Sequence, residues 1–119
     1  MRRDERAYLN DIIEACAAIE QALTGRDLPA YRASRLVRSA VEREFIIVGE
    51  AMAALSRLSP QLFGQITHAR RIVDFRNQLA HEYSDVDDTV VWLIARHDVP
   101  VLHAECAVLL KGLGDLERI

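Results

Sequence analysis

Four polar side chains fall close together in the sequence and are of the types needed to cleave a phosphodiester. They are Arg76, Asn77, His81 and Tyr83. An arginine can grip phosphate oxygens in a fork and stabilise the charge that develops in the transition state. A histidine changes charge near neutral pH, so it can take a proton from a ribose 2′-hydroxyl or give one to a leaving oxygen. An asparagine can orient the imidazole, and a tyrosine offers a hydroxyl for hydrogen bonding or modification. The set predicts phosphodiester chemistry without a metal ion.

The spacing of these residues predicts that one helix, over residues 66–83, carries all of them. Asn77 and His81 are four residues apart and share a face. Arg76 and His81 lie about 140° apart on an ideal helix, so they are not automatic neighbours. Three arrangements would join them: Arg76 swings round, the helix loosens before Tyr83, or a second subunit completes the site. The alternative is that both are ordinary solvated or structural residues.

The remaining sequence predicts an all-α fold, because apolar residues recur at intervals of three and four. A first helix is expected over about 6–22, stopped by Thr24 and Gly25. Asp27 and Pro29 are expected to open one long second helix of some 27 residues, about 40 Å, that ends near Ser59. Such a length favours an elongated antiparallel bundle of four to five helices. A single domain spanning residues 1–119 is expected.

The second half of the chain begins with a short link at 60–64, before the helix over 66–83. Asp85 resembles the N-cap of a further helix, with Asp87 and Asp88 at its positive end. The run 98–100, Asp-Val-Pro, predicts either a kink or the start of a fifth helix.

Charge is distributed unevenly along the chain. The formal net charge is −3, which argues against a strongly basic, sequence-blind nucleic-acid binder. Residues 1–81 hold twelve arginines and ten acidic residues, whereas residues 82–119 hold three basic and eight acidic residues. A polyanion is therefore expected to meet the first two-thirds of the chain. The fourteen arginines against one lysine favour bidentate phosphate contacts, or reflect biased codon usage.

The two cysteines, Cys16 and Cys106, each sit on an apolar helical stripe and are expected to be small core residues in a reducing compartment. His103 and Cys106 are three residues apart and could ligate a metal, although a core thiol beside a surface imidazole is the commoner arrangement. We expect no metal site and no cofactor.

The octapeptide 76–83, RNQLAHEY, resembles the R-x4-H-x-Y signature of HEPN domains, specifically the HepT-like toxins. Three further blocks agree in order with that family. Residues 35–51 resemble its second helix, and residues 84–92 and 98–100 resemble the segments that follow the motif. The resemblance covers most of the chain, from about residue 27 to 110.

This resemblance implies a helical bundle that dimerises, with the two motifs facing each other across a cleft. It implies a metal-independent ribonuclease toxin, paired with an antitoxin of the minimal nucleotidyltransferase kind. By the same resemblance, Arg76 and His81 are catalytic and Asn77 supports them. Tyr83 is the residue that the antitoxin can adenylylate to silence the toxin.

Three residues just before the motif qualify this picture. Arg70 and Arg71 are expected to contact RNA phosphates, where the two chains of a dimer would bring their arginines together. Asp74 stands where many relatives have a small or apolar residue. It could weaken RNA binding, or it could pair with Arg70 or Arg71.

Two other functions fit the same sequence. The chain could be a non-catalytic nucleotide- or substrate-binding partner of a nucleotidyltransferase, or a helical dimer whose partner surface is its whole purpose. The expected partners are RNA, a second copy of the chain and the cognate antitoxin, with no DNA and no membrane. With no apolar run of membrane-spanning length and no secretory signal, the expected location is the cytoplasm.

Overall fold

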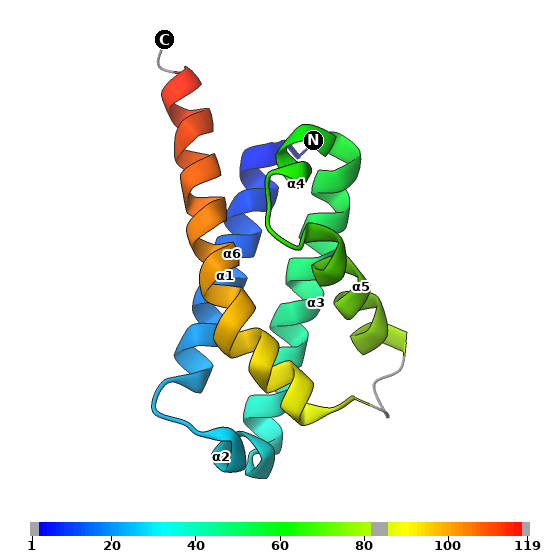
Figure 1. Cartoon of the computed structure of the whole chain (residues 1–119). Helices are drawn as coiled ribbons and strands as arrows, with labels where there is room; N and C mark the ends of the chain where they lie inside the picture. The colour runs from blue at the N-terminus through cyan, green and yellow to red at the C-terminus, as the bar shows by residue number, and fades with distance from the viewer. Residues whose placement is uncertain (1–2, 82–85, 118–119) are drawn as a thin grey trace.

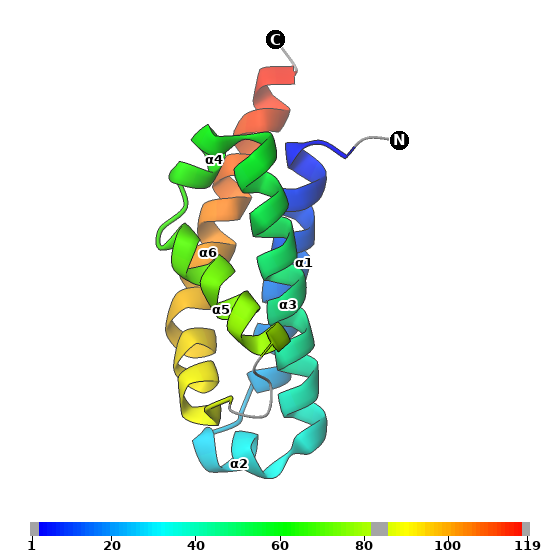
Figure 2. The same cartoon turned by 90° about the vertical axis from the view of Figure 1, so that its right-hand side faces the viewer.

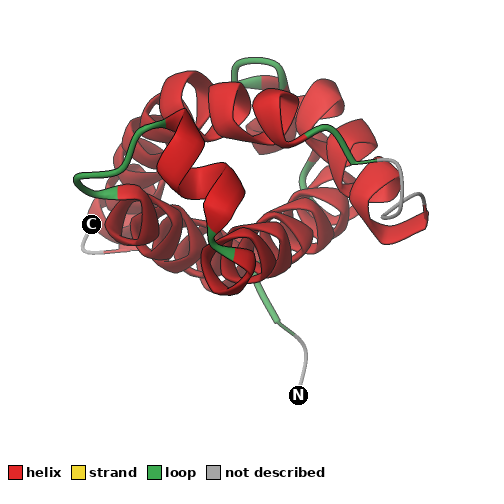
Figure 3. Cartoon of the chain, turned by 90° about the horizontal axis from the view of Figure 1, so that it is seen from below, coloured by secondary structure: helices red, strands yellow, loops and turns green. Residues whose placement is uncertain are grey.

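The structure, a computed structural model, describes residues 3–81 and 86–117, and all of its regular elements in these ranges are helices (Figure 3). Successive long helices run in opposite directions in a bundle that measures 50 × 29 × 26 Å (Figure 1). The expected all-α, elongated bundle is confirmed. Within the described ranges there are six helices, where four to five were expected: α1 (Glu5–Leu23), α2 (Leu28–Ala33), α3 (Arg35–Leu58), α4 (Pro60–Gly64), α5 (Ala69–His81) and α6 (Asp88–Glu117).

The first helix has the expected extent, because local signals define both of its ends. At the start of α1, the Asp4 side chain accepts a hydrogen bond from the Ala7 N–H at 3.2 Å. At its end, Gly25 adopts a φ of +74°, a conformation that favours glycine. The stop at Thr24 and Gly25 is confirmed.

The prediction of one long second helix is wrong in one respect, because the helix is interrupted at Ser34. Asp27 does cap its start, where its carboxylate accepts from the Ala30 N–H at 2.9 Å. Ser34 then leaves the helical conformation, with φ −105° and ψ 100°, and its hydroxyl accepts from the Val37 N–H at 3.2 Å. A side-chain cap thereby ends α2 and starts α3, which turns the short α2 across the end of the bundle (Figure 1).

The elements around the motif helix also differ in detail from expectation. The link 60–64 forms the short helix α4, and α5 starts at Ala69 rather than at residue 66. Immediately before α5 the chain makes a turn at His68, whose φ is +56°. Thr67 is held to α6, since its N–H and its hydroxyl both donate to the Glu105 carboxylate, at 2.9 and 2.6 Å.

The last helix, α6, is a single element, and Pro100 lies inside it. The start of a fifth helix at 98–100 is therefore wrong, because one helix continues through this run. The expected cap Asp85 lies outside the described residues. Asp87 bonds to the first turn of α6, because its carboxylate accepts from the Thr89 N–H at 2.9 Å.

The core lies between α1, α3 and α6, because α1 packs against both of the other two, and α5 packs against α3 (Figure 2). Within the described ranges the buried residues are hydrophobic, with no buried charged side chain. Cys16 of α1 and Cys106 of α6 are fully buried free thiols, as expected for core residues. Burial raises the pKa of both thiols, that of Cys106 to about 12, so they remain neutral apolar groups.

Three polar residues, Arg38, Glu42 and Asp88, lie close together at the α2 end of the bundle. They make the free energy of unfolding depend on pH. Arg38 of α3 pairs with Asp88 of α6 at 3.9 Å. Glu42, one turn after Arg38, has a pKa raised above 4.5, chiefly by burial and further by the Asp88 carboxylate, with Arg38 opposing the shift. The folded protein therefore binds more protons at Glu42 than the unfolded chain does. This contribution to stability is present below about pH 4.5 and is lost as the pH rises through the raised value.

We expect the Glu42→Gln variant to gain thermal stability relative to the wild type as the pH rises from about 4 to 7, because the glutamine carries no charge to desolvate. Thermal melts of both proteins across this range measure the effect. Glu50→Gln, an exposed position on the same helix, is the matched control. A difference in Tm between wild type and Glu42→Gln that does not change with pH would contradict the assignment.

Candidate active site

The motif helix α5 has one buried face and one open face. Ala69, Val73 and Leu79 are buried on the inner side, where Phe75 also meets Phe45 of α3 edge to face, with ring centroids 5.2 Å apart. These apolar contacts fix which way the helix faces. The polar residues on the outer side are thereby presented to solvent.

An open groove of about 530 Å³ runs along this outer face. It is lined by Arg71, Asp74, Phe75, Asn77, Gln78 and His81. The structure therefore brings together four of the residues singled out in the sequence, Arg71, Asp74, Asn77 and His81. A cation, an amide and an imidazole along one groove form a set that can hold a phosphate and move a proton.

Arg76 lies on a different side of α5 from this groove. Its aliphatic stem lies against Gly49 of α3, and its Nε atom is buried without a hydrogen-bond partner. Within residues 3–81 and 86–117, no carboxylate forms an ion pair with its guanidinium. Among the described residues the terminal nitrogens have no acidic partner, and a guanidinium of this kind can bind an external anion.

Arg76 and His81 do not share a groove within one chain. The angle expected between them on an ideal helix persists, because α5 is a regular helix as far as His81. Of the three arrangements considered, loosening of the helix therefore does not bring Arg76 and His81 together, because the helix stays regular through His81. Tyr83, the motif tyrosine, lies outside the described residues.

The two arginines before the motif have different surroundings. Arg71 lines the groove, while the guanidinium of Arg70 lies over the Phe63 ring of α4, 5.2 Å from its centroid. Asp74 lines the groove beside Arg71, and in the described part of the chain it forms no ion pair with Arg70 or Arg71. The groove therefore contains an acidic side chain, Asp74, beside the basic Arg71.

The comparison with known families decides between the helical bundles that such a groove could belong to. The profile of the family described as ribonuclease HepT-like matches residues 12–109 of the chain. The chain belongs to the HepT-like ribonuclease family.

Individual relatives agree with this assignment. The HepT-like chain is 30% identical to a "Probable ribonuclease HepT" of Thermococcus cleftensis, over 93% of this chain and 100% of the relative. It is 28% identical to a "Putative RNase" of Methanocaldococcus jannaschii, over 91% of this chain and 98% of the relative. A second protein of that organism, a "Gamma-glutamylcyclotransferase and putative RNase", is 28% identical, and the chain spans 51% of its length. No solved structure matches the HepT-like chain significantly.

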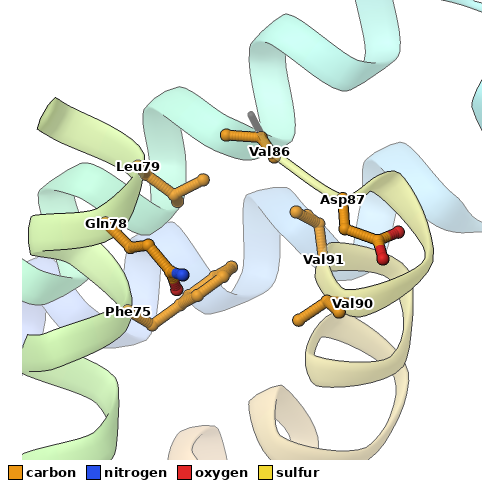
Figure 4. Close-up of a pocket in the computed structure, with 7 residues that line it drawn as sticks. All are labelled: Phe75, Gln78, Leu79, Val86, Asp87, Val90 and Val91. Atoms are coloured by element: carbon orange, nitrogen blue, oxygen red, sulfur yellow. The ribbon is translucent and has the colours of Figure 1, made fainter. Parts of the chain in front are cut away.

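A second, smaller pocket lies between the motif helix and the start of α6 (Figure 4). Phe75 and Leu79 of α5 face Val91 of α6 across it, with the polar ends of Gln78 and Asp87 at its edges. Its volume is about 80 Å³, below the roughly 300 Å³ at which pockets for small organic ligands begin. Its lining serves to join the two helices rather than to hold a nucleotide.

The residues considered as metal ligands have other partners or surroundings. The Nδ1 atom of His103 lies 2.7 Å from a carboxylate oxygen of Glu20, while Cys106 is buried. In the described residues, no three histidine, cysteine or acidic side chains gather in a way that could hold a metal ion. None of the helices described in this HepT-like chain has the length and apolar character required to cross a membrane.

Sequence reasoning missed several residues that shape the site. Gln78 lines the groove, Glu105 anchors the turn before α5, and Gly49 receives the stem of Arg76. The signal for Gly49 was a single glycine inside a long helix, which usually marks close packing. The role of Glu105 depends on a contact across 38 residues of sequence, which no local pattern reveals.

Proposed function

We propose that this chain is a metal-independent endoribonuclease, the toxin of a pair in which a minimal nucleotidyltransferase antitoxin adenylylates Tyr83. One observation supports the proposal most directly: an exposed histidine lies in an open polar groove on the helix whose arginine has no ion-pair partner among the described residues. Family membership and the names of the relatives support RNA as the substrate.

In this mechanism, the imidazole of His81 accepts the proton of a ribose 2′-hydroxyl. The 2′-oxygen attacks the adjacent phosphorus, the bond to the 5′-oxygen breaks, and a protonated imidazole returns a proton to that oxygen. The products are a 2′,3′-cyclic phosphate and a 5′-hydroxyl. The guanidinium of Arg76 stabilises the negative charge on the non-bridging oxygens, which is the task that a metal ion performs in other nucleases. Asn77, one turn before His81, orients the imidazole.

The active species is a homodimer in this proposal. Arg76 and His81 lie on different sides of α5, so two copies of the helix can join one chain's arginine to the other chain's histidine. The solvent-exposed side of α6 also carries apolar side chains that a second copy could cover: Val90, Leu93, Val101 and Val108. If Arg71 and Arg76 of both copies converge on one groove, their four cations outnumber the two Asp74 carboxylates that the same groove receives.

Cleavage of a short RNA by the purified protein in EDTA tests the proposal. We expect product with a 2′,3′-cyclic phosphate end, and none from an RNA whose ribose at the cleaved position is 2′-deoxy. His81→Ala should lower the rate on the order of 10²- to 10⁴-fold. His103→Ala, which removes a histidine of α6 that pairs with Glu20 of α1 outside the groove, should leave the rate unchanged.

The state of Tyr83 decides how an inactive preparation is interpreted. Mass spectrometry of the intact protein detects an added AMP, and Tyr83→Phe cannot receive one. An unmodified wild-type protein that leaves RNA intact would exclude the nuclease. It would instead favour a binding partner of a nucleotidyltransferase.

A further inference from the structure

Gly49 lies in the middle of α3, directly beneath the stem of Arg76. A Cβ atom placed on Gly49 would be 2.0 Å from the Cβ of Arg76 and 2.3 Å from its Cγ. Carbon atoms that are not bonded normally stay about 3.5–4.0 Å apart. Gly49 is buried and its φ is helical, so the position needs the absence of a side chain rather than conformational freedom. The Arg76 stem occupies the space that a side chain at position 49 would fill.

This contact restricts where the guanidinium can go. The Cδ of Arg76 is still within 3.4 Å of the same point on α3, and the next atom, Nε, is buried with no hydrogen-bond partner. An exposed arginine has several flexible torsions, whereas here the first part of the side chain is packed against the neighbouring helix. The two terminal nitrogens therefore project from a stem whose direction α3 defines.

The neighbouring packing supports this role for the contact. One turn earlier on α3, Phe45 holds Phe75, the residue that precedes Arg76, in an edge-to-face contact. The Phe45–Phe75 pair sets the rotation of α5, and Gly49 leaves room for the next side chain. Other helical glycines differ: around Gly112 and Gly114 of α6, an added Cβ would meet no atom within 4 Å.

We propose that Gly49 is the positioning residue for Arg76, and that the bare backbone of α3 at this point aims the guanidinium at the scissile phosphate. The inference rests on the proposed ribonuclease function and adds to it a residue outside the motif, in a different helix. Because the Cβ of Arg76 is fixed to its backbone, a methyl group at position 49 must push α5 away at this point, and the arginine stem moves with it, while the motif sequence is unchanged.

Activity measurements on Gly49→Ala test the positioning role. Misplacing a catalytic group by about 1 Å can lower kcat on the order of 10²-fold, and we expect an effect of that size. Gly112→Ala, which also adds a methyl group to a helical glycine, should leave kcat unchanged. In an Arg76→Gly background, Gly49→Ala should cause no further loss, because both the guanidinium that it misplaces and the Cβ that it would strike are absent. An additional loss in that background, or full activity of Gly49→Ala, would overturn the proposal.

A second measurement needs no RNA cleavage, so it separates failure of this inference from failure of the proposed function. In the wild type, the Nε–H signal of Arg76 in an NMR spectrum should exchange slowly with water, since the atom is buried. Arg76→Lys identifies this signal by removing it. In Gly49→Ala the signal should exchange as fast as those of exposed arginines, and in Gly112→Ala it should stay slow. A signal that stays slow in Gly49→Ala overturns the proposal, whether or not the wild type cleaves RNA.

Thermal melts cover the case in which Gly49→Ala does not fold. The double variant Gly49→Ala/Arg76→Gly removes the stem that the new methyl group would strike. We expect Gly49→Ala to lower Tm in the presence of Arg76 and not to lower it beside Gly at position 76. An equal loss of Tm in both backgrounds would show that the arginine stem is not what occupies this space, and would refute the inference.

Discussion

An equimolar mixture of the Arg76→Ala and His81→Ala variants is expected to cleave RNA, although each variant alone is nearly inactive. Each single variant should lose on the order of 10²- to 10⁴-fold in rate, since each removes one of the two groups proposed to act on the phosphate. In a mixed dimer, one of the two sites pairs the intact Arg76 of one chain with the intact His81 of the other. Half of the dimers in a random mixture are mixed, so about a quarter of the wild-type activity should return.

The same mixture distinguishes a shared site from a site within one chain. If Arg76 and His81 of the same chain acted together, no dimer in the mixture would contain an intact pair, and the activity would stay at the level of the single variants. The comparison uses variants mixed under unfolding conditions and refolded together, with each variant refolded alone as the control. Absence of recovery, with mixed dimers demonstrated by mass spectrometry, would contradict the shared site.

Replacing Ile12 by alanine should produce the largest loss of stability among the changes considered. Ile12 is fully buried in α1, the helix that packs against both α3 and α6. Truncating a buried isoleucine removes its apolar contacts and leaves a cavity, which lowers the free energy of unfolding by about 3 kcal/mol. For a domain of this size, Tm should fall by roughly 10–15 °C.

Leu36→Ala is the matched control for Ile12→Ala. It also shortens an aliphatic side chain on a helix, but Leu36 is 81% exposed. Its effect on the free energy of unfolding should stay within about 0.5 kcal/mol. Similar losses in the two variants, measured by chemical denaturation, would show that α1 does not occupy the centre of the core.

Most of the fold could be predicted from the sequence because local chemistry defines most helix ends. Gly25 stops α1 and Asp27 caps α2, and both signals can be read without the rest of the molecule. The break at Ser34 could not be predicted in the same way. Ser34 and Ser39 are both serines in a helical pattern, yet Ser34 leaves the helix and Ser39 stays in it. The difference depends on how α2 meets the end of the bundle, which is a tertiary contact.

The composition of the candidate site was also open to prediction, but its arrangement was not. The spacing of Asn77 and His81 correctly placed both on one face of a helix, and the structure adds that this face lines a groove. The direction of Arg76 depends on Gly49, which lies 27 positions away in the sequence and gives no sign of its partner. The burial of the arginine stem is therefore a property of helix packing and not of the motif.

Because α5 packs mainly on one neighbour, the free energy of its local opening should be lower than that of unfolding the whole bundle. α5 buries three side chains and packs mainly on α3, whereas α3 buries eight residues. Segments with fewer buried contacts open locally at a free energy below that of global unfolding, and their amide hydrogens exchange sooner. The amides of α5 should therefore exchange ahead of those in the middle of α1 and α3. Local opening of the motif helix is therefore expected at a free energy at which the rest of the bundle stays folded.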